Sequence, residues 1–176
     1  MKRTVPALLA SLVLAAAPAA HAAPLVWTLV DGLLDDGGAA SGSFIYDADT
    51  NTFSAINLVT TGGSVLSGGT FQVLLAGDGN AAAFVPDGAL TSSPVLQLIF
   101  DTPLTNDGTV VLLANPFFPA GSSFEATCED GACLSAAFGR SFVDGALISS
   151  PVPVPAAAWL LGGALGVLPL VRRRRG

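Results

Sequence analysis

Apolar residues between positions 24 and 149 fall in short runs that show no 3.6-residue period. Each run is rich in Val, Leu, Ile, Ala or Phe and ends at Gly, Pro, Asn or Asp, so that a turn signal recurs about every ten residues. Regular turns between short strands are typical of a β-sandwich or a jelly roll. We therefore predict an all-β fold, a single antiparallel β-sandwich or jelly-roll-like domain with about eight or nine strands in two sheets.

The expected strands follow these apolar runs. Their ranges are 24–31, 41–46, 52–60, 70–76, 81–85, 94–100, 109–114 and 146–149, with short candidates at 134–138 and 141–143. The stretch 123–127 leads into the cysteine loop. The run 94–100 is the most apolar and should lie near the centre of a sheet. The stretch 33–38 should be a loop, 62–69 a flexible glycine loop, and Asp144 with Gly145 a turn. The predicted core consists of Trp27, Phe44, Ile56, Phe71, Leu74, Leu96, Leu98, Phe100, Val111 and Leu113.

An acidic hairpin turn is predicted between the second and third of these strands. Asp47, Asp49 and Asn51 are residue types whose side chains bond to nearby backbone in turns. The same spacing opens a calcium loop, but an EF-hand needs Gly at the sixth position and Glu at the twelfth. This chain has Thr52 and Leu58 there. A shallow calcium site at the three turn residues is the alternative to a plain hairpin, and no other cofactor is expected.

The charge of the chain is distributed unevenly. All 13 Asp and Glu residues lie between positions 23 and 151, where Arg140 is the only Lys or Arg. This body therefore carries 1 − 13 = −12, against −6 for the whole chain. Such a body repels nucleic acid phosphates, so no nucleic-acid partner is expected. Its acidic turns should keep an exported domain soluble.

Lys and His are missing from this body, because Lys2 and His21 precede position 23. Catalysis by Ser-His-Asp or Cys-His groups, a His-ligated zinc site and Schiff-base chemistry are therefore excluded. A two-carboxylate glycosidase is the enzyme class that the composition still permits, with Glu125 and Glu129 among the candidates. Nothing in the pattern singles out a pair, so we expect no enzyme and no catalytic residue.

The two cysteines, Cys128 and Cys133, are separated by four residues with a central Asp-Gly. Export would place them where disulfides persist, so a local disulfide closing a tight loop is expected. A metal site and a redox-active pair are the alternatives. Two thiolates without His are few for a metal, and the redox motif has two intervening residues rather than four.

The first 22 residues have the pattern of a secretory signal peptide. Two basic residues precede an apolar stretch at 5–17, and the sequence Ala-His-Ala that ends at Ala22 fits the small-x-small cleavage rule. Cleavage is expected between Ala22 and Ala23, which leaves a β-domain at 23–148. A retained N-terminal helix is the alternative.

The C-terminal part has three consecutive elements. A linker at 149–155 ends in the box Val152, Pro153, Val154 and Pro155, and the segment 156–176 holds sixteen uncharged residues followed by Arg172, Arg173, Arg174 and Arg175. As a helix, this apolar stretch would span about 24 Å, slightly less than a hydrocarbon core of about 30 Å. Arginine side chains can reach the interface. We expect a transmembrane helix with its arginines on the cytoplasmic side.

This tail resembles the PEP-CTERM class of bacterial C-terminal sorting signals. The class has a Val-Pro-x-Pro box, an apolar helix that often opens with Ala-Ala-Ala-Trp-Leu, and a terminal arginine cluster. The residues that match are Val152, Pro153, Pro155, Ala156, Ala157, Ala158, Trp159, Leu160, Gly162, Gly163 and the four arginines, with Val171 closing the apolar segment. Val154 stands where the class has the Glu of its name, so the chain resembles the Val-Pro-Leu-Pro-Ala variant. Which member of the processing-enzyme family would act is left open by this difference.

The resemblance implies that an exosortase-type membrane peptidase cuts at or near the box, and that the product leaves the inner membrane for the cell surface or the extracellular medium. Proteins of this class are associated with exopolysaccharide and biofilm in Gram-negative bacteria. The expected mature product is a non-enzymatic, acidic β-domain of the envelope or extracellular matrix. The alternatives are a carbohydrate- or calcium-binding adhesin and a protein that stays anchored in the membrane.

Overall fold

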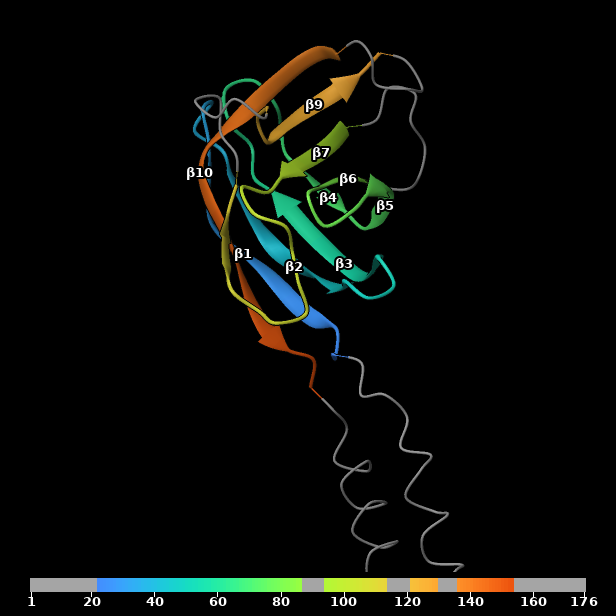
Figure 1. Cartoon of the computed structure of the whole chain (residues 1–176). Coiled ribbons are helices and arrows are strands. Elements are labelled where there is room, and N and C mark those ends of the chain that lie inside the picture. The colour runs from blue at the N-terminus through green and yellow to red at the C-terminus, as the bar shows by residue number, and fades with distance from the viewer. Residues whose placement is uncertain (1–21, 87–93, 114–120, 130–135, 154–176) are drawn as a thin grey trace, which may run out of the picture.

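The computed structural model describes residues 22–86, 94–113, 121–129 and 136–153. The described residues form ten β-strands (Figure 1), which are β1 (Leu25–Leu34), β2 (Ala39–Asp47), β3 (Thr52–Thr60), β4 (Gly69–Phe71), β5 (Val73–Gly77), β6 (Ala81–Val85), β7 (Pro94–Ile99), β8 (Val110–Leu112), β9 (Phe124–Cys128) and β10 (Ala136–Pro151). They contain no helix, and accordingly none that is long and apolar enough to cross a membrane.

The strands form one antiparallel sheet in the order β4-β3-β2-β1-β10-β9-β7-β6-β5, with β8 paired to β10 beside this path. Only Gln72 separates β4 from β5, so the chain itself connects the two ends of the sheet. The Gln72 backbone N donates to the Val85 carbonyl oxygen at 3.1 Å, which ties this connection to β6. The sheet is therefore nearly closed and barrel-like.

The prediction of an all-β antiparallel fold is confirmed, whereas the two separate sheets of a sandwich are replaced by this continuous sheet. The difference comes from β10, a single strand of sixteen residues. Its C-terminal part pairs with β1 and its N-terminal part with β9, so it belongs to both halves of the molecule (Figure 1).

The predicted turn at Asp144 and Gly145 is wrong, because both residues lie inside β10. Gly145 has a φ of 152°, and the pairing of β10 with β1 is irregular at this point, opposite Gly32 and Leu33. A Cβ at Gly145 would lie 3.0 Å from Leu113 Cδ1. Glycine therefore permits a bulge and a close approach in a continuing strand, where its sequence pattern suggested a reversal.

The hydrophobic core lies inside the curved sheet, and the part the structure describes is drawn from residues between Leu25 and Leu147. Most of the predicted core is buried, namely Trp27, Phe44, Phe71, Leu96, Leu98, Phe100, Val111 and Leu113. The other two predicted core residues, Ile56 and Leu74, are partly buried against it. Phe53 connects the aromatic residues, with its ring centroid 5.4 Å from that of Phe44 and 4.5 Å from that of Tyr46.

Other local predictions can be compared strand by strand. The hairpin of β2 and β3 and the inner position of β7, between β9 and β6, are confirmed. The single strand expected at 70–76 is interrupted at Gln72, where the chain passes between the two ends of the sheet. The loop expected at 33–38 starts late, because β1 continues to Leu34.

Both ends of the described chain leave the domain side by side. Leu25, the first residue of β1, pairs with Pro151, the last residue of β10. Figure 1 shows the two chain ends emerging at the same end of the molecule. Ser149 and Ser150, expected in the linker, belong to the sheet through their pairing with Trp27 and Val26.

Candidate functional site

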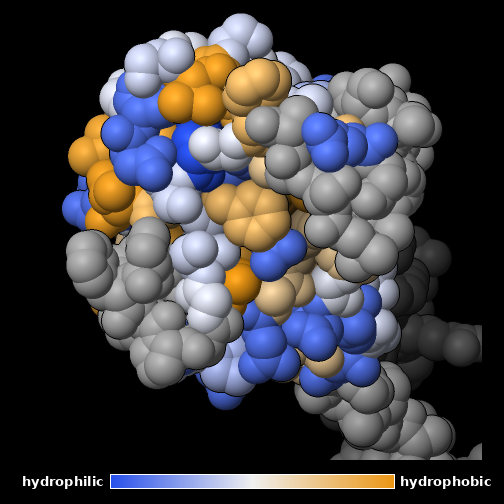
Figure 2. All heavy atoms as spheres, turned by 90° about the horizontal axis from the view of Figure 1, so that it is seen from above, coloured by the Kyte–Doolittle hydropathy of each residue, from blue (hydrophilic) through white to orange (hydrophobic). Residues whose placement is uncertain are grey.

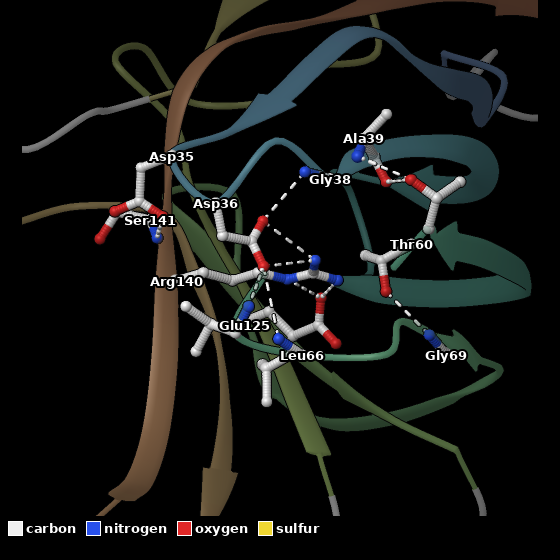
Figure 3. Close-up of polar contacts among 12 residues, drawn as sticks. Asp35, Asp36, Gly38, Ala39, Thr60, Leu66, Gly69, Glu125, Arg140 and Ser141 are labelled. Carbon is white, nitrogen blue, oxygen red and sulfur yellow. Dashed lines mark hydrogen bonds and ion pairs between the residues drawn. The ribbon is translucent and has the colours of Figure 1, made fainter. Parts of the chain in front are cut away.

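The most extensive polar site among the described residues is a buried network around Arg140 (Figure 3). Arg140 Nε and Nη2 donate to Glu125 Oε2 at 3.0 and 2.7 Å. Arg140 Nη1 donates to both carboxylate oxygens of Asp36 at 3.1 Å. The Arg140 side chain is 0% exposed and the two carboxylate side chains are each 1% exposed. The three groups together carry a net charge of −1.

Backbone pairing brings these three side chains together. Arg140 on β10 is the direct cross-strand partner of Glu125 on β9. Asp36 follows β1, where the Asp35 backbone N donates to the Ser141 carbonyl oxygen at 2.9 Å and the Ser141 N donates to Asp35 Oδ1 at 3.1 Å. These two bonds hold the β1–β2 turn against β10, so that Asp36 faces the guanidinium group.

Asp36 also organises the loop that follows β3. Its Oδ2 accepts from the backbone N of Val65 at 3.2 Å and of Leu66 at 3.4 Å, and its Oδ1 accepts from Gly38 N at 2.9 Å. Its carbonyl oxygen accepts from Ser64 N at 3.0 Å. The flexible glycine loop predicted at 62–69 is therefore anchored by a buried carboxylate, which a composition rich in Gly and Ser does not reveal.

The electrostatics of Asp36 follow from these contacts. Burial by itself raises the pKa of this carboxyl group, because it disfavours the charged form. The hydrogen bonds from Gly38, Val65, Leu66 and Arg140 stabilise the anion and outweigh burial, so the pKa falls from 3.8 to about 2. Asp36 is consequently ionised throughout the neutral range and balances the guanidinium charge.

Two glycines make room for the network. An added Cβ at Gly38 would overlap Arg140 Nη1, and one at Gly63 would overlap the Asp36 carboxyl group. Both positions therefore need glycine for close packing against charged side chains. Gly63 is therefore explained by close contact with Asp36, and Gly38 by close contact with Arg140.

The network links four parts of the chain, which are the β1–β2 turn, the loop after β3, β9 and β10. Its side chains are closed to solvent, so they cannot reach a substrate. In such a network the carboxylates accept the hydrogen bonds that the guanidinium donates, and the paired side chains hold their backbone segments in place. We assign the network a structural role at the junction where β10 passes from one half of the sheet to the other.

The acidic turn predicted as an alternative calcium site is hydrogen-bonded within its hairpin and to Asn106 from the loop before β8. Asp47 Oδ1 accepts from Asp49 N at 3.0 Å and from Asn106 Nδ2 at 3.0 Å, and Asp47 Oδ2 accepts from Thr50 Oγ1 at 2.9 Å. The bond from Asn106 is the main reason why the pKa of Asp47 lies below its ordinary value. Asn51 Oδ1 accepts from the Tyr46 hydroxyl at 2.9 Å. Within the described ranges, no group of three or more His, Cys, Asp or Glu residues could hold a metal ion.

The remaining predicted site residues lie at the borders of the described chain. Cys128 closes β9, is buried and is disulfide-bonded, and Cys133 lies outside the described residues. Val152 and Pro153 directly follow β10 and are not in a strand. The residues 1–21 of the predicted signal peptide and 154–176 of the predicted tail, which include Val154, Pro155 and the arginine cluster, lie outside the described residues.

The described surface includes an open hollow on one sheet face. This hollow of about 350 Å³ over β5, β6 and β7 is lined by Ala76, Gly77, Asp78, Ala81, Ala82, Ala83 and Gln97, a set without an aromatic ring for sugar stacking. Exposed apolar residues on β8 and β10 include Val110, Leu112 and Ile148. Seen from the end opposite the chain ends, hydrophobic and hydrophilic residues are interspersed (Figure 2).

Comparison with protein-family models, with curated proteins and with solved structures finds no match for this chain.

Sequence reasoning did not find the Asp36–Arg140–Glu125 network. A signal was present, because Arg140 is the only base in a body with 13 acidic residues. The sequence does not show which of these carboxylates pair with Arg140, because only the fold brings two of them within hydrogen-bond distance.

Proposed function

We propose that this protein is an exported, non-enzymatic protein of the cell surface or extracellular matrix, sorted by a PEP-CTERM-like tail and processed by an exosortase-type peptidase. The observation that carries the proposal is the position of the box relative to the fold. β10 ends at Pro151, and Val152 and Pro153 follow it immediately as irregular chain. A peptidase could therefore bind the box as an extended segment without unfolding a strand.

The geometry of the chain ends supports the same proposal. Since Leu25 and Pro151 are paired neighbours, a signal peptide before Ala23 and a tail after the box would both start from one end of the domain. A precursor with both segments in the same membrane would then hold the domain on one side, with the opposite end pointing away. Prolines at 153 and 155 would keep the box out of a strand and out of the helix expected after it.

The character of the domain is consistent with a structural or matrix role. Its one basic side chain is buried in the network, so the described surface presents carboxylates without Lys or Arg. Such a surface favours solubility and gives the domain a uniformly negative field. The linkage to exopolysaccharide or biofilm comes from the resemblance of the tail alone.

Mass spectrometry of the mature protein tests the processing claim. The full chain is expressed in a bacterium with an exosortase, and the surface or secreted form is isolated and its C-terminal peptide identified. We expect a product that ends at or near the box and lacks Arg172 to Arg175. A matched variant with Pro153→Ala and Pro155→Ala should accumulate with its tail intact. A surface protein of the unaltered sequence that keeps its four arginines would instead be a permanently anchored envelope protein.

A further inference from the structure

The peptide bond between Ala22 and Ala23 lies against the loop that precedes β8. Asn106 Nδ2 donates to the Ala22 carbonyl oxygen at 3.5 Å and to Asp47 Oδ1 at 3.0 Å. Asn106 Oδ1 accepts from Ala48 N at 2.9 Å, which fixes the orientation of this amide. One side chain therefore connects the residue before the expected cleavage point with the turn between β2 and β3.

The sheet register places the start of the mature chain beside the same turn. Leu25 pairs with Tyr46 at the end of the ladder between β1 and β2. Continuing this antiparallel register by two residues sets Ala23 opposite Ala48, next to Asp47. Only Pro24 separates Ala23 from the ladder, so Ala23 has little remaining chain freedom beside the β2–β3 turn.

Cleavage changes the chemistry at this point. Hydrolysis adds water across the bond, the Ala22 carboxyl group leaves with the signal peptide, and Ala23 gains an α-amino group that is protonated at neutral pH. Asn106 Nδ2 loses its carbonyl partner at the same time. The carbonyl oxygen and nitrogen of one peptide bond are only about 2.3 Å apart, so the new ammonium group forms beside the side chain that binds Asp47.

Within the part of the chain that the structure describes, the charged side chains on the turns around this point are carboxylates. Asp47 and Asp49 lie on the β2–β3 turn, Asp107 follows Asn106, and Asp78 lies on the turn between β5 and β6. Burial raises the pKa of Tyr46, and the charges of Asp78 and Asp47 raise it further, which shows that this hydroxyl senses both carboxylates. The one basic residue of the described chain, Arg140, is bound within its own network.

We propose that the α-ammonium group of Ala23, created by signal-peptide removal, binds the Asp47 carboxylate beside Asn106. The mature domain then has an ionic contact that the precursor lacks. This contact fixes the start of the mature chain to the turn between β2 and β3. The inference rests on the proposed export and on cleavage between Ala22 and Ala23.

The test compares two proteins that both end at Pro155. Each keeps the whole described core, which lies between Leu25 and Leu147. One begins with a free Ala23, and the other carries two additional glycines before Ala23. We expect NMR titration to place the pKa of the Ala23 α-amino group above its ordinary range of about 7.7–8.0, by about half a unit. Below that range the free-Ala23 protein should melt about 2 °C higher. The advantage should disappear as the pH rises through the raised pKa, because the contact stabilises only the protonated amine.

Asp47→Asn should return the pKa of the Ala23 α-amino group to the ordinary range and abolish the difference in melting temperature between the two proteins. The control variant Asp31→Asn, on the irregular part of β1, should leave this pKa and this difference unchanged. An α-amino group with an ordinary pKa in the unaltered protein, or equal melting temperatures for the two chains, would overturn the proposal. Both chains are made with defined N-termini, so this outcome is independent of export. N-terminal sequencing of the exported protein tests the cleavage separately.

Discussion

Arg140 Nη2 lies 2.7 Å from Glu125 Oε2, and the two residues are direct cross-strand partners on β10 and β9. The only cation of an acidic body is thereby placed inside the protein, between two carboxylates that are almost fully buried. Removing charges from water costs several kcal/mol per ion, and good geometry with further hydrogen bonds is needed to offset it. The backbone donors at Asp36 supply those further bonds.

Arg140→Met should destabilise the domain by about 3–5 kcal/mol, because it leaves two buried carboxylates without their cation. Adding Glu125→Leu should recover about 2 kcal/mol or more of this loss, since the second substitution removes the unpaired charge on β9. Urea unfolding at neutral pH measures both free energies. A double variant no more stable than Arg140→Met alone would contradict the assigned coupling.

Arg140→Lys is the matched control for these variants. The lysine keeps the charge but lacks the planar fork that reaches both carboxylates at once. Its stability should therefore lie between those of the unaltered protein and Arg140→Met. A lysine variant as stable as the unaltered protein would show that charge alone is sufficient at this position.

Acid should weaken the contact between Asp36 and the loop after β3. The folded-state pKa of about 2 lies below the ordinary 3.8, so the contribution of Asp36 is fully present above about pH 4–5 and is lost as the pH falls toward 2. The stability difference between the unaltered protein and Asp36→Asn should shrink over this range. Unfolding curves recorded at intervals from pH 6 to pH 2 measure it, and a difference that stays constant with pH would exclude a depressed pKa.

Gly63→Ala should cost about 1–3 kcal/mol, because the new methyl group would overlap the Asp36 carboxyl group. Gly69→Ala is the control within the same segment. Its Cβ would meet only the Phe71 ring at 3.7 Å, an ordinary contact, so the change should stay within about 0.5 kcal/mol. Thermal or urea unfolding of the two variants compares them directly, and equal effects would argue against packing around Asp36 as the reason for Gly63.

Reduction of the disulfide at Cys128 should lower the stability only modestly. Cys128 and Cys133 enclose four residues, and in the chain-entropy model such a small loop contributes less than the roughly 3 kcal/mol of a fifteen-residue loop. Melting with and without a reductant measures the effect, and peptide mapping without reduction checks that the two cysteines are joined. Complete unfolding on reduction would show that the bond has a larger role than loop closure.

The fold class could be predicted because strands and turns have local causes. Short apolar runs indicated most of the core, and the residue types at 47–51 predicted the β2–β3 hairpin. The path of β10 could not be predicted in this way. Asp144 and Gly145 have the local chemistry of a turn, and only pairing with β1 and β8 on either side keeps the strand continuous.

The candidate site was still less accessible to sequence reasoning. Asp36 and Arg140 are separated by 104 positions, and Glu125 and Arg140 by 15. No periodicity connects positions so far apart, because their proximity follows from strand pairing and not from a local repeat. The glycines at 38 and 63 illustrate the same limit, since their need for small size comes from side chains elsewhere in the chain.

The sequence by itself determined the all-β class, most of the core, the uneven charge and the expectation of two targeting segments, because each depends on composition or on neighbouring residues. The tertiary structure alone decided that the sheet nearly closes, that the two ends of the domain leave together, and that Arg140, the one cation between positions 23 and 151, lies buried between Asp36 and Glu125. The physical reason is that burial and ion pairing depend on groups brought together from distant strands. A carboxylate can pair with a cation only when strand pairing has placed the two side chains next to each other.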